Sequence, residues 1–147
     1  MRNRAAGFYA NHHPGGINCF NNTAYQNSVN FNLLGRNAGH TADVPGYGHT
    51  LKNNLGYKGR TEISNFDAST CEFAANSFGL KIKLEDRDFK CLDQAPLVLP
   101  RKPNGDLPEI PFMQLNAGNP AIDRGVDLGR PNHGSAPDLG AFESDLR

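Results

Sequence analysis

Short runs of alternating apolar and polar residues, separated by asparagine pairs, dominate the first half of the chain. Residues 17–27 read INCFNNTAYQN and residues 49–59 read HTLKNNLGYKG, so each has a short strand pattern on both sides of an Asn-Asn step. Superposed at an offset of 32 residues, the two segments also align Tyr25 with Tyr57. Helical periodicity is scarce. This pattern predicts an internal repeat built from short strands.

A repeat of this length predicts stacked units, because a unit this short cannot bury its own apolar face and must pack on its neighbour. We interpret the unit as one coil of a parallel β-helix, since it is too long for one strand and has no helix pattern. Asparagine suits the corners of such a coil because it tolerates left-handed backbone angles. Its amide also reaches the equivalent asparagine of the next coil, ~4.8 Å away. The alternative is a chance resemblance between two Asn-rich turns.

Three further segments predict how the stack continues. Residues 34–48 read as a loop that grows out of the stack, between the two repeat units. Residues 65–78 carry another short strand pair and end in Asn-Ser-Phe. Residues 79–84 (GLKIKL) alternate apolar and charged side chains, which is the pattern of a half-exposed strand.

The rest of the chain predicts irregular structure. Residues 85–93 are strongly charged and predict a turn or a short helix. Residues 96–111 contain five prolines and an Asn-Gly-Asp turn signal, which indicates a wrap over the surface. We therefore expect one all-β domain over residues 1–147, with coils over 1–84 and an irregular C-terminal wrap and cap over 85–147.

Composition changes this picture little but excludes several functions. The chain has 17 Asn, 16 Gly and 10 Pro, which is typical of disorder or of many tight turns; its 9 Phe and 4 Tyr favour a packed, turn-rich fold. Its 15 basic and 15 acidic residues leave no broad basic face for nucleic acid or anionic lipid. No apolar stretch approaches the roughly 20 residues needed to cross a bilayer. The first residues lack the apolar segment of a signal peptide, so the chain is either cytoplasmic or missing its true beginning.

Three cysteines, Cys19, Cys71 and Cys91, lie far apart and form no Cys-x-x-Cys pair. This spacing indicates neither a zinc site nor a disulfide framework. We interpret them as buried free thiols. One Cys19–Cys71 bridge is the alternative for an oxidising compartment.

Several segments, in order along nearly the whole chain, resemble the pectate lyases of polysaccharide lyase family 9 and related right-handed β-helix proteins. The closing motif is shared by many β-helix proteins, whereas its combination with the other segments is more specific. The segments are GFYANHHPGG (7–16) with INCFNNTAYQNSVNF, the Lys52-Asn53-Asn54-Leu55 coil, DFKCLD (88–93) with PRKPNGDLPEIPFMQL (100–115), and NPAIDRGVDLG (119–129) with APDLGAFE (136–143).

The resemblance implies a right-handed parallel β-helix of the single-stranded-solenoid type, and β-elimination on polygalacturonate by a secreted parent protein. In such a reaction Ca²⁺ on the uronate carboxylate stabilises the developing carbanion, and a lysine or arginine removes the C5 proton. Ca²⁺ requires clustered oxygen ligands, usually aspartates on adjacent coils. This chain has no aspartate cluster before Asp86 and no match to the family's lysine-bearing, glycine-rich segment. We therefore expect the last two to four coils plus a C-terminal cap, with no catalytic residue and no Ca²⁺ bound by this chain.

Candidate substrate-binding residues follow the first predicted strand. Asn11, His12 and His13 would lie beside the last coil that flanks the family's cleft and form one wall of the substrate groove. The alternative is an ordinary surface turn before Pro14. Members of the family tend to have aspartate where Tyr9 stands, which weakens the groove interpretation.

Other charged residues have structural interpretations beside the functional ones. Cations such as Lys52, Lys58 and Arg60 could contact a polyanion, although a solvated strand edge explains them as well. The acidic run 85–88 is interrupted by arginine and reads as an exposed charged turn rather than a cation site. The aspartates of the closing motif, next to Gly or Pro, predict hydrogen bonds to their own backbone rather than to a metal. These aspartates are Asp123, Asp127 and Asp138, and the predicted loop adds Arg36, His40 and Asp43, to which no role is assigned.

The leading functional hypothesis is a C-terminal part of a secreted, Ca²⁺-dependent pectate lyase-like protein that acts on an acidic plant polysaccharide and is inactive by itself. A second hypothesis is a non-catalytic β-helix that binds polysaccharide or serves a structural role, and a third is a lyase for another uronic-acid polymer. If the stack has an open first coil, the isolated chain should be marginally stable or associate through that coil.

Overall fold

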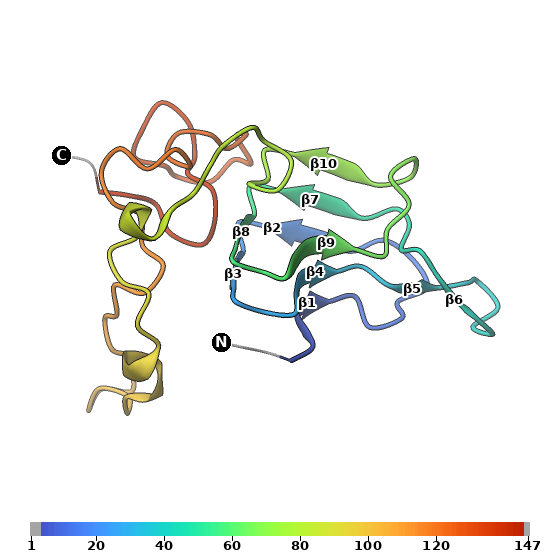
Figure 1. The fold of residues 1–147 in the computed structure, drawn as a ribbon, viewed down its shortest axis with the longest axis horizontal. Coiled ribbons are helices and arrows are strands. Elements are labelled where there is room, and N and C mark those ends of the chain that lie inside the picture. The colour runs from blue at the N-terminus through green and yellow to red at the C-terminus, as the bar shows by residue number, and fades with distance from the viewer. Residues whose placement is uncertain (1–3, 146–147) are drawn as a thin grey trace.

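The structure, a computed structural model, describes residues 4–145, and its regular elements are almost all short β-strands (Figure 1). Within these residues there is no α-helix, only two 3₁₀ turns. The strands are β1 Ala6–Tyr9, β2 Asn18–Phe20, β3 Thr23–Tyr25, β4 Val29–Asn32, β5 Gly35–Arg36, β6 Asp43–Val44, β7 Thr50–Lys52, β8 Leu55–Tyr57, β9 Thr61–Ser64 and β10 Glu72–Ala74; the 3₁₀ turns are η1 Asp86–Asp88 and η2 Ala95–Val98.

The strands form small parallel sheets that lie next to one another. One sheet has the order β1-β4-β9, a second β10-β7-β2, and a third pairs β3 with β8. Every ladder in these three sheets is parallel and joins strands that are separated along the chain by two or by four other strands. The chain therefore passes through the same strand positions again on each circuit, as Figure 1 shows for β2, β7 and β10.

The predicted repeat register is confirmed. Cys19 pairs with Leu51, and Tyr25 with Tyr57, at the offset of 32 residues expected from the sequence. The two tyrosine rings stack, with centroids 5.9 Å apart. Identical side chains at equivalent positions thus lie directly above each other, so the repeat is a structural one and not a chance resemblance of turns.

The predicted asparagine ladder is also confirmed, and it has one step more than the sequence indicated. The Asn22 amide donates to Asn54 Oδ1 (3.0 Å), and the Asn54 amide donates to Asn76 Oδ1 (2.8 Å). Asn76 was not part of the predicted repeat, because it follows Asn54 by 22 residues instead of 32. The longer unit contains the 34–48 loop, and the next unit has no equivalent of it.

The asparagine pairs divide two tasks between their members. The first member takes the left-handed backbone conformation at the corner, with φ of 52° at Asn21 and 57° at Asn53. The second member, Asn22 or Asn54, forms the ladder. Asparagine is among the few residues that adopt a left-handed angle at low cost, which explains why the pair recurs.

The core has two parts. The first fills the coils, where Phe31 is fully buried between the rings of Phe8 and Phe78. The second lies between the β3–β8 side of the stack and the C-terminal segment, in which Met113 and Leu139 are buried against Leu55. Its backbone is tied to the corner as well, because Gly140 N–H donates to Asn53 O (2.8 Å). The C-terminal segment therefore packs against one side of the stacked strands.

Two strand predictions were wrong. Residues 79–84 form no strand, although Leu80 and Ile82 pack on the second core cluster while the lysines between them are exposed. The alternation thus reported burial correctly, but no neighbouring strand offers its backbone groups there. Residues 65–78 contain the single strand β10 and not a strand pair. The short helix expected within 85–93 is confirmed as η1, and the loop 34–48 is confirmed as a protrusion that contains the antiparallel β5–β6 hairpin.

A buried histidine joins the first coil to the next. His49 is fully buried; its Nδ1 accepts from Ile17 N–H (3.0 Å), and its Nε2 lies 3.2 Å from Leu33 O. Because an amide N–H can only donate, Nδ1 is the acceptor and Nε2 carries the proton. Gly46 lies against this ring, and a Cβ there would fall 1.8 Å from Leu33 O. The neutral ring therefore bridges two coils where only glycine leaves room for it.

All three cysteines are free; Cys19 is buried, whereas Cys71 and Cys91 are partly exposed. Burial raises the pKa of the Cys19 thiol above its ordinary value. The buried-thiol interpretation therefore holds for Cys19 and is too strong for the other two. Among residues 4–145 no helix is long and apolar enough to cross a membrane.

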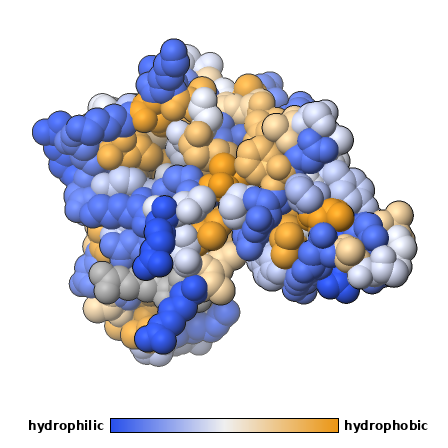
Figure 2. Space-filling view, turned by 45° about the vertical axis from the view of Figure 1, so that its right-hand side comes forward, coloured by the Kyte–Doolittle hydropathy of each residue, from blue (hydrophilic) through white to orange (hydrophobic). Residues whose placement is uncertain are grey.

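The surface is mixed rather than uniformly polar. On the face seen in Figure 2, apolar side chains form small patches broken up by charged and polar ones. The most exposed of the large apolar side chains are Val98 and Leu107. Both belong to residues 95–111, the arm that begins with η2. Between this arm and β3 lies an apolar pocket of about 500 Å³, lined by Tyr25, Leu107 and Phe112 among others. In the described residues β2 and β3 each have one edge without a partner strand, and β3 lines the pocket.

We expect the isolated chain to self-associate through these edges, because unpaired strand edges beside an apolar pocket favour strand addition. Sedimentation equilibrium should give an average mass above that of one 16.0 kDa chain at micromolar concentration. Replacing Thr23, which faces the pocket, with lysine should shift the protein toward monomer. A monomer at all concentrations with cooperative unfolding would contradict the prediction.

Candidate functional site

The turn after β1 gives the candidate residues their positions. Asn11 and His12 both have left-handed backbone angles, with φ of 53° and 59°, so the chain reverses sharply there. The turn is held by His12 N–H, which donates to Leu34 O (3.0 Å), and by His13 N–H, which donates to Ala10 O (3.1 Å). It therefore packs at the base of the 34–48 loop.

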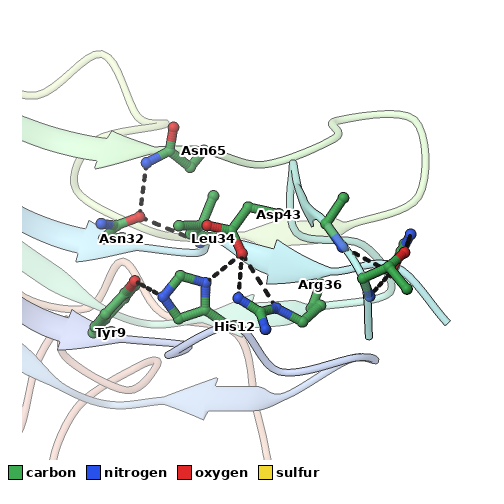
Figure 3. Close-up of polar contacts among 10 residues, drawn as sticks. Tyr9, His12, Asn32, Leu34, Arg36, Asp43 and Asn65 are labelled. Carbon is green, nitrogen blue, oxygen red and sulfur yellow. Dashed lines mark hydrogen bonds and ion pairs between the residues drawn. The ribbon is translucent and has the colours of Figure 1, made fainter. Parts of the chain in front are cut away.

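His12 is the centre of a polar cluster that joins β1 to the β5–β6 hairpin (Figure 3). Its Nε2 lies 2.8 Å from the Tyr9 hydroxyl, and its Nδ1 lies 2.7 Å from Asp43 Oδ1. The Tyr9 and His12 rings also meet edge to face, with centroids 5.6 Å apart. All three side chains are partly exposed to solvent. The cluster thus presents one ring nitrogen to a hydroxyl and the other to a carboxylate.

The hairpin contributes a second charge to this cluster. Arg36 lies opposite Asp43 in the β5–β6 ladder, and its Nε and Nη2 donate to Asp43 Oδ1 at 3.2 and 2.9 Å. The Arg36 guanidinium, helped by His12, holds the pKa of the Asp43 carboxyl below its ordinary range. Asp43 is therefore ionised at neutral pH, and its charge orients the Arg36 guanidinium and the His12 ring.

The other two candidate residues lie beside the cluster and not in it. Asn11 is exposed, and His13 is exposed with its Nδ1 3.1 Å from Gly15 O. His13 also bridges to Gly35, the first residue of β5. The structure thus keeps the three residues on one exposed turn, but brings only His12 into contact with the charges of the hairpin. The groove-wall role remains a prediction.

A row of polar side chains continues from Tyr9 across the sheet. Tyr9 pairs with Asn32 of β4, and Asn32 with Ser64 of β9. At the end of these strands Asn65 donates to Asn32 Oδ1 (2.9 Å), which also accepts from Leu34 N–H (3.2 Å). This second asparagine contact fixes the loop entrance next to the His12 cluster (Figure 3).

Three members of the cluster were not assigned from the sequence: Tyr9, Arg36 and Asp43. A local signal did exist for Arg36 and Asp43, because a short loop with opposite charges near both ends favours a hairpin salt bridge. Their contact to His12 spans 31 residues and depends on how the loop folds back on the stack. No spacing rule for that separation exists.

The acidic residues near η1 form ion pairs and backbone hydrogen bonds within the structure. In residues 4–145 no three or more His, Cys, Asp or Glu side chains are grouped so that they could hold a metal ion. Glu85 pairs with Lys83 and Arg87, and Asp88 accepts from Glu85 N–H in a capping interaction at η1. The charged-turn interpretation is therefore confirmed.

The closing-motif aspartates bind backbone, as the sequence predicted. Asp127 accepts from Gly129 N–H (2.7 Å), and Asp123 from Ala136 N–H (3.2 Å). The buried Asp138 accepts from Asp123 N–H and Ser144 N–H. These carboxylates therefore stabilise the C-terminal segment through hydrogen bonds to its backbone.

The candidate cations differ in their surroundings. Lys52 pairs with Glu72 of the neighbouring strand (2.6 Å), which fits a solvated strand edge. Lys58 pairs with Asp86 (2.6 Å). Arg60 makes no ion pair among the described residues, and His40 lies exposed at the tip of the hairpin loop.

Comparison with known proteins gives a consistent result, although no family model matches the chain. Pectate lyase L of Dickeya dadantii (strain 3937) is 33% identical over 142 residues, which cover 96% of this chain and 31% of that protein. Pectate lyase L of Dickeya chrysanthemi is 32% identical over the same length. Among solved structures, pectate lyase Pel9A matches with a TM-score of 0.75 and 29% identity over 96% of this chain and 33% of its own. A rhamnogalacturonan lyase matches with a TM-score of 0.72 and 40% identity over 78% of this chain and 28% of its own.

The stacked parallel strands and these matches define a pectate lyase-like β protein. In particular, the chain is homologous to pectate lyase L and to Pel9A, of polysaccharide lyase family 9, over 96% of its length. It spans about a third of the length of these relatives.

Proposed function

We propose that this chain forms the C-terminal coils and cap of a right-handed parallel β-helix in a secreted, Ca²⁺-dependent pectate lyase-like protein. The observation that carries the proposal is the match to Pel9A over 96% of this chain but only 33% of that structure. The edges of β2 and β3 that have no partner strand among the described residues support it, because a preceding coil would pair with them. In this role the chain supplies scaffold and one wall of the groove for an acidic plant polysaccharide.

Calcium would be held elsewhere in such a protein. Ca²⁺ requires six to eight oxygen ligands, and the described residues offer no suitable cluster. The best acidic candidates, near η1 and in the cap, already accept hydrogen bonds or pair with cations. The residues present therefore do not fit the ion, and we derive no catalytic step through it on this chain.

The groove wall would consist of Asn11, His12 and His13. The turn is exposed, and the Asp43 carboxylate orients the His12 ring beside the Tyr9 hydroxyl. Hydroxyl and imidazole groups suit the hydroxyls of a sugar, and Arg36 adds a cation for a uronate carboxylate. These groups lie on β1, on the turn after it and on the β5–β6 hairpin, and all are at least partly exposed.

The test uses the whole chain with polygalacturonate and with rhamnogalacturonan. We expect no unsaturated product by ultraviolet absorbance, with Ca²⁺ or with a chelator, because the described residues include no metal-ligating cluster and the sequence has no match to the family's lysine-bearing segment. We also expect retardation in a polygalacturonate gel that weakens about three- to tenfold in His12→Ala, since one or two hydrogen bonds are lost. His133→Ala, which removes an exposed histidine paired with Asp145, is the matched control and should bind normally.

Either of two results would count against the proposal. Calcium-dependent product from the chain alone would show that catalytic residues are present. Equal binding of the His12→Ala and His133→Ala proteins would contradict the interpretation of the turn after β1 as a wall of the substrate groove.

The rhamnogalacturonan lyase match supports a second candidate, a lyase-like protein for a different pectic polymer. Its identity of 40% exceeds that of the Pel9A match, though over less of the chain. Stronger retardation by rhamnogalacturonan than by polygalacturonate would favour this candidate. Retention on both polymers without any product from a longer parent protein would favour a non-catalytic polysaccharide-binding protein.

A further inference from the structure

A basic pocket lies at the corner opposite the His12 cluster, where the sheet β1-β4-β9 begins. It is open, has a volume of about 660 Å³, and is formed by the equivalent turns 26–28 and 58–60 of two successive coils together with Arg4. Three of its lining residues are cations, namely Arg4, Lys58 and Arg60, and none is acidic. Their side chains are exposed at the rim.

The geometry of the coils keeps acidic groups away from Arg60. Glu62, two residues later, turns its carboxylate inward, where Oε1 accepts from Gly59 N–H (2.9 Å) and Oε2 from the buried Asn30 amide (2.6 Å). Neither Arg4 nor Arg60 pairs with a carboxylate in the part of the chain that the structure describes. Two guanidinium groups therefore border one pocket without a counter-charge in contact.

The third cation, Lys58, forms an ion pair with a carboxylate at the edge of the pocket. Lys58 pairs with Asp86 of η1, which also accepts a hydrogen bond from the Tyr57 hydroxyl. Lys58, helped by the tyrosine, holds the pKa of Asp86 below its ordinary range, so Asp86 is ionised at neutral pH. Asp86 therefore opposes an incoming anion and competes with it for Lys58.

We propose that this pocket binds the carboxylate of an acidic sugar, at a subsite separate from the Asn11–His13 turn. The proposal rests on the proposed function for the choice of ligand class. A guanidinium group binds carboxylate through two parallel hydrogen bonds, and the partly exposed Ser28 hydroxyl in the pocket wall suits a sugar hydroxyl. The polar, open wall disfavours an apolar ligand.

The test is a titration of the ¹⁵N-labelled full chain with trigalacturonate, followed through the amide signals of Gly59 and Arg60. We expect saturable shifts there, and an affinity reduced on the order of tenfold in Arg60→Glu because a charge-assisted contact is replaced by repulsion. Arg60→Gln, a milder change, should show a smaller loss. Asp86→Asn should bind about threefold more tightly, since it frees Lys58 and keeps an acceptor for Tyr57.

Lys81→Glu is the matched control, because it makes the same change of charge at an exposed lysine outside the pocket. It should bind within about twofold of the parent chain. A loss of affinity in Lys81→Glu equal to that in Arg60→Glu would contradict the assignment of this pocket as a binding site. Weaker binding in Asp86→Asn than in the parent chain would do the same. Maltotriose, which is neutral, should cause no shift, and equal affinity for inorganic phosphate would overturn the assignment to an acidic sugar.

The outcomes also separate this inference from the proposed function. Trigalacturonate shifts confined to the Asn11–His13 turn would reject the basic pocket and leave the proposed function in place. Absence of shifts with any uronate would reject both.

Discussion

Replacing Asn54 with alanine is expected to lower the free energy of unfolding by about 3–5 kcal/mol. Asn54 is fully buried in the middle of the ladder. Its amide donates to Cys19 O (2.7 Å) and to Asn76, and its Oδ1 accepts from both Asn22 N–H and the Asn22 side chain. Alanine would leave several buried groups without a partner, and each costs roughly 1–3 kcal/mol.

The measurement is urea unfolding followed by circular dichroism, with Asn104→Ala as the control. Asn104 forms two hydrogen bonds with Asp106 in an exposed turn, where water replaces them, so its loss should cost below about 1 kcal/mol. If the two variants unfold at the same urea concentration, the ladder does not stabilise the stack as argued here. Leucine at position 54 should be no better than alanine, because it fills the space but satisfies none of the buried groups.

The ladder also explains how much of the fold could be predicted from the sequence. The two Asn-Asn steps and the tyrosines 32 residues apart were sufficient to predict parallel stacking and register, because identical residues at identical coil positions bond to each other. The third step was missed because Asn76 follows an alanine instead of a second asparagine. Ala75 takes the left-handed angle there, with φ of 50°, a conformation that its side chain does not indicate.

The strand prediction for residues 79–84 was wrong for a different reason. Alternation reports which side chains are buried, and Leu80, Ile82 and Leu84 do pack on the core. A strand additionally requires a neighbour with unpaired backbone groups, and the segment leaves the stack after β10 toward the cap. Pattern alone contains no information on that neighbour.

The candidate site was predictable only in part for a similar reason. His12 and its neighbours were candidates because they are polar residues in a predicted turn, within a segment that resembles the pectate lyases. The structure confirms that the turn is exposed. The partners that orient His12 come from the hairpin and from β1, and their approach depends on how a 15-residue insertion folds back. The basic pocket likewise joins turns of two coils, so its cations are scattered in the sequence.

The second large effect is expected from pH and is centred on His49. We expect the free energy of unfolding to fall as the pH is lowered from 7 to 5, with a slope of up to ~1.4 kcal/mol per pH unit from this residue. Burial lowers the pKa of His49 below its ordinary value of 6.5, in spite of the Leu33 carbonyl, which favours the charged form; the nearby His13 lowers it slightly further. Protonation would also place a second N–H against Ile17 N–H, which now donates to Nδ1.

The sign follows from proton binding in the two states. Below about pH 6.5 the histidine of the unfolded chain takes up a proton, while the folded chain does so only at lower pH, so acid favours unfolding; above pH 7 both forms are neutral and the effect vanishes. The urea midpoints measured at pH 7, 6 and 5 should differ less in His49→Gln than in the parent chain, because glutamine cannot titrate. Glutamine still offers one hydrogen-bond acceptor and one donor. The control His40→Gln, at the exposed tip of the hairpin loop, should keep the full slope. Glu143, whose pKa is raised mainly by burial, works in the opposite direction in all three proteins and cancels in the comparison. An unchanged slope in His49→Gln would mean that the ring is not held neutral between the coils.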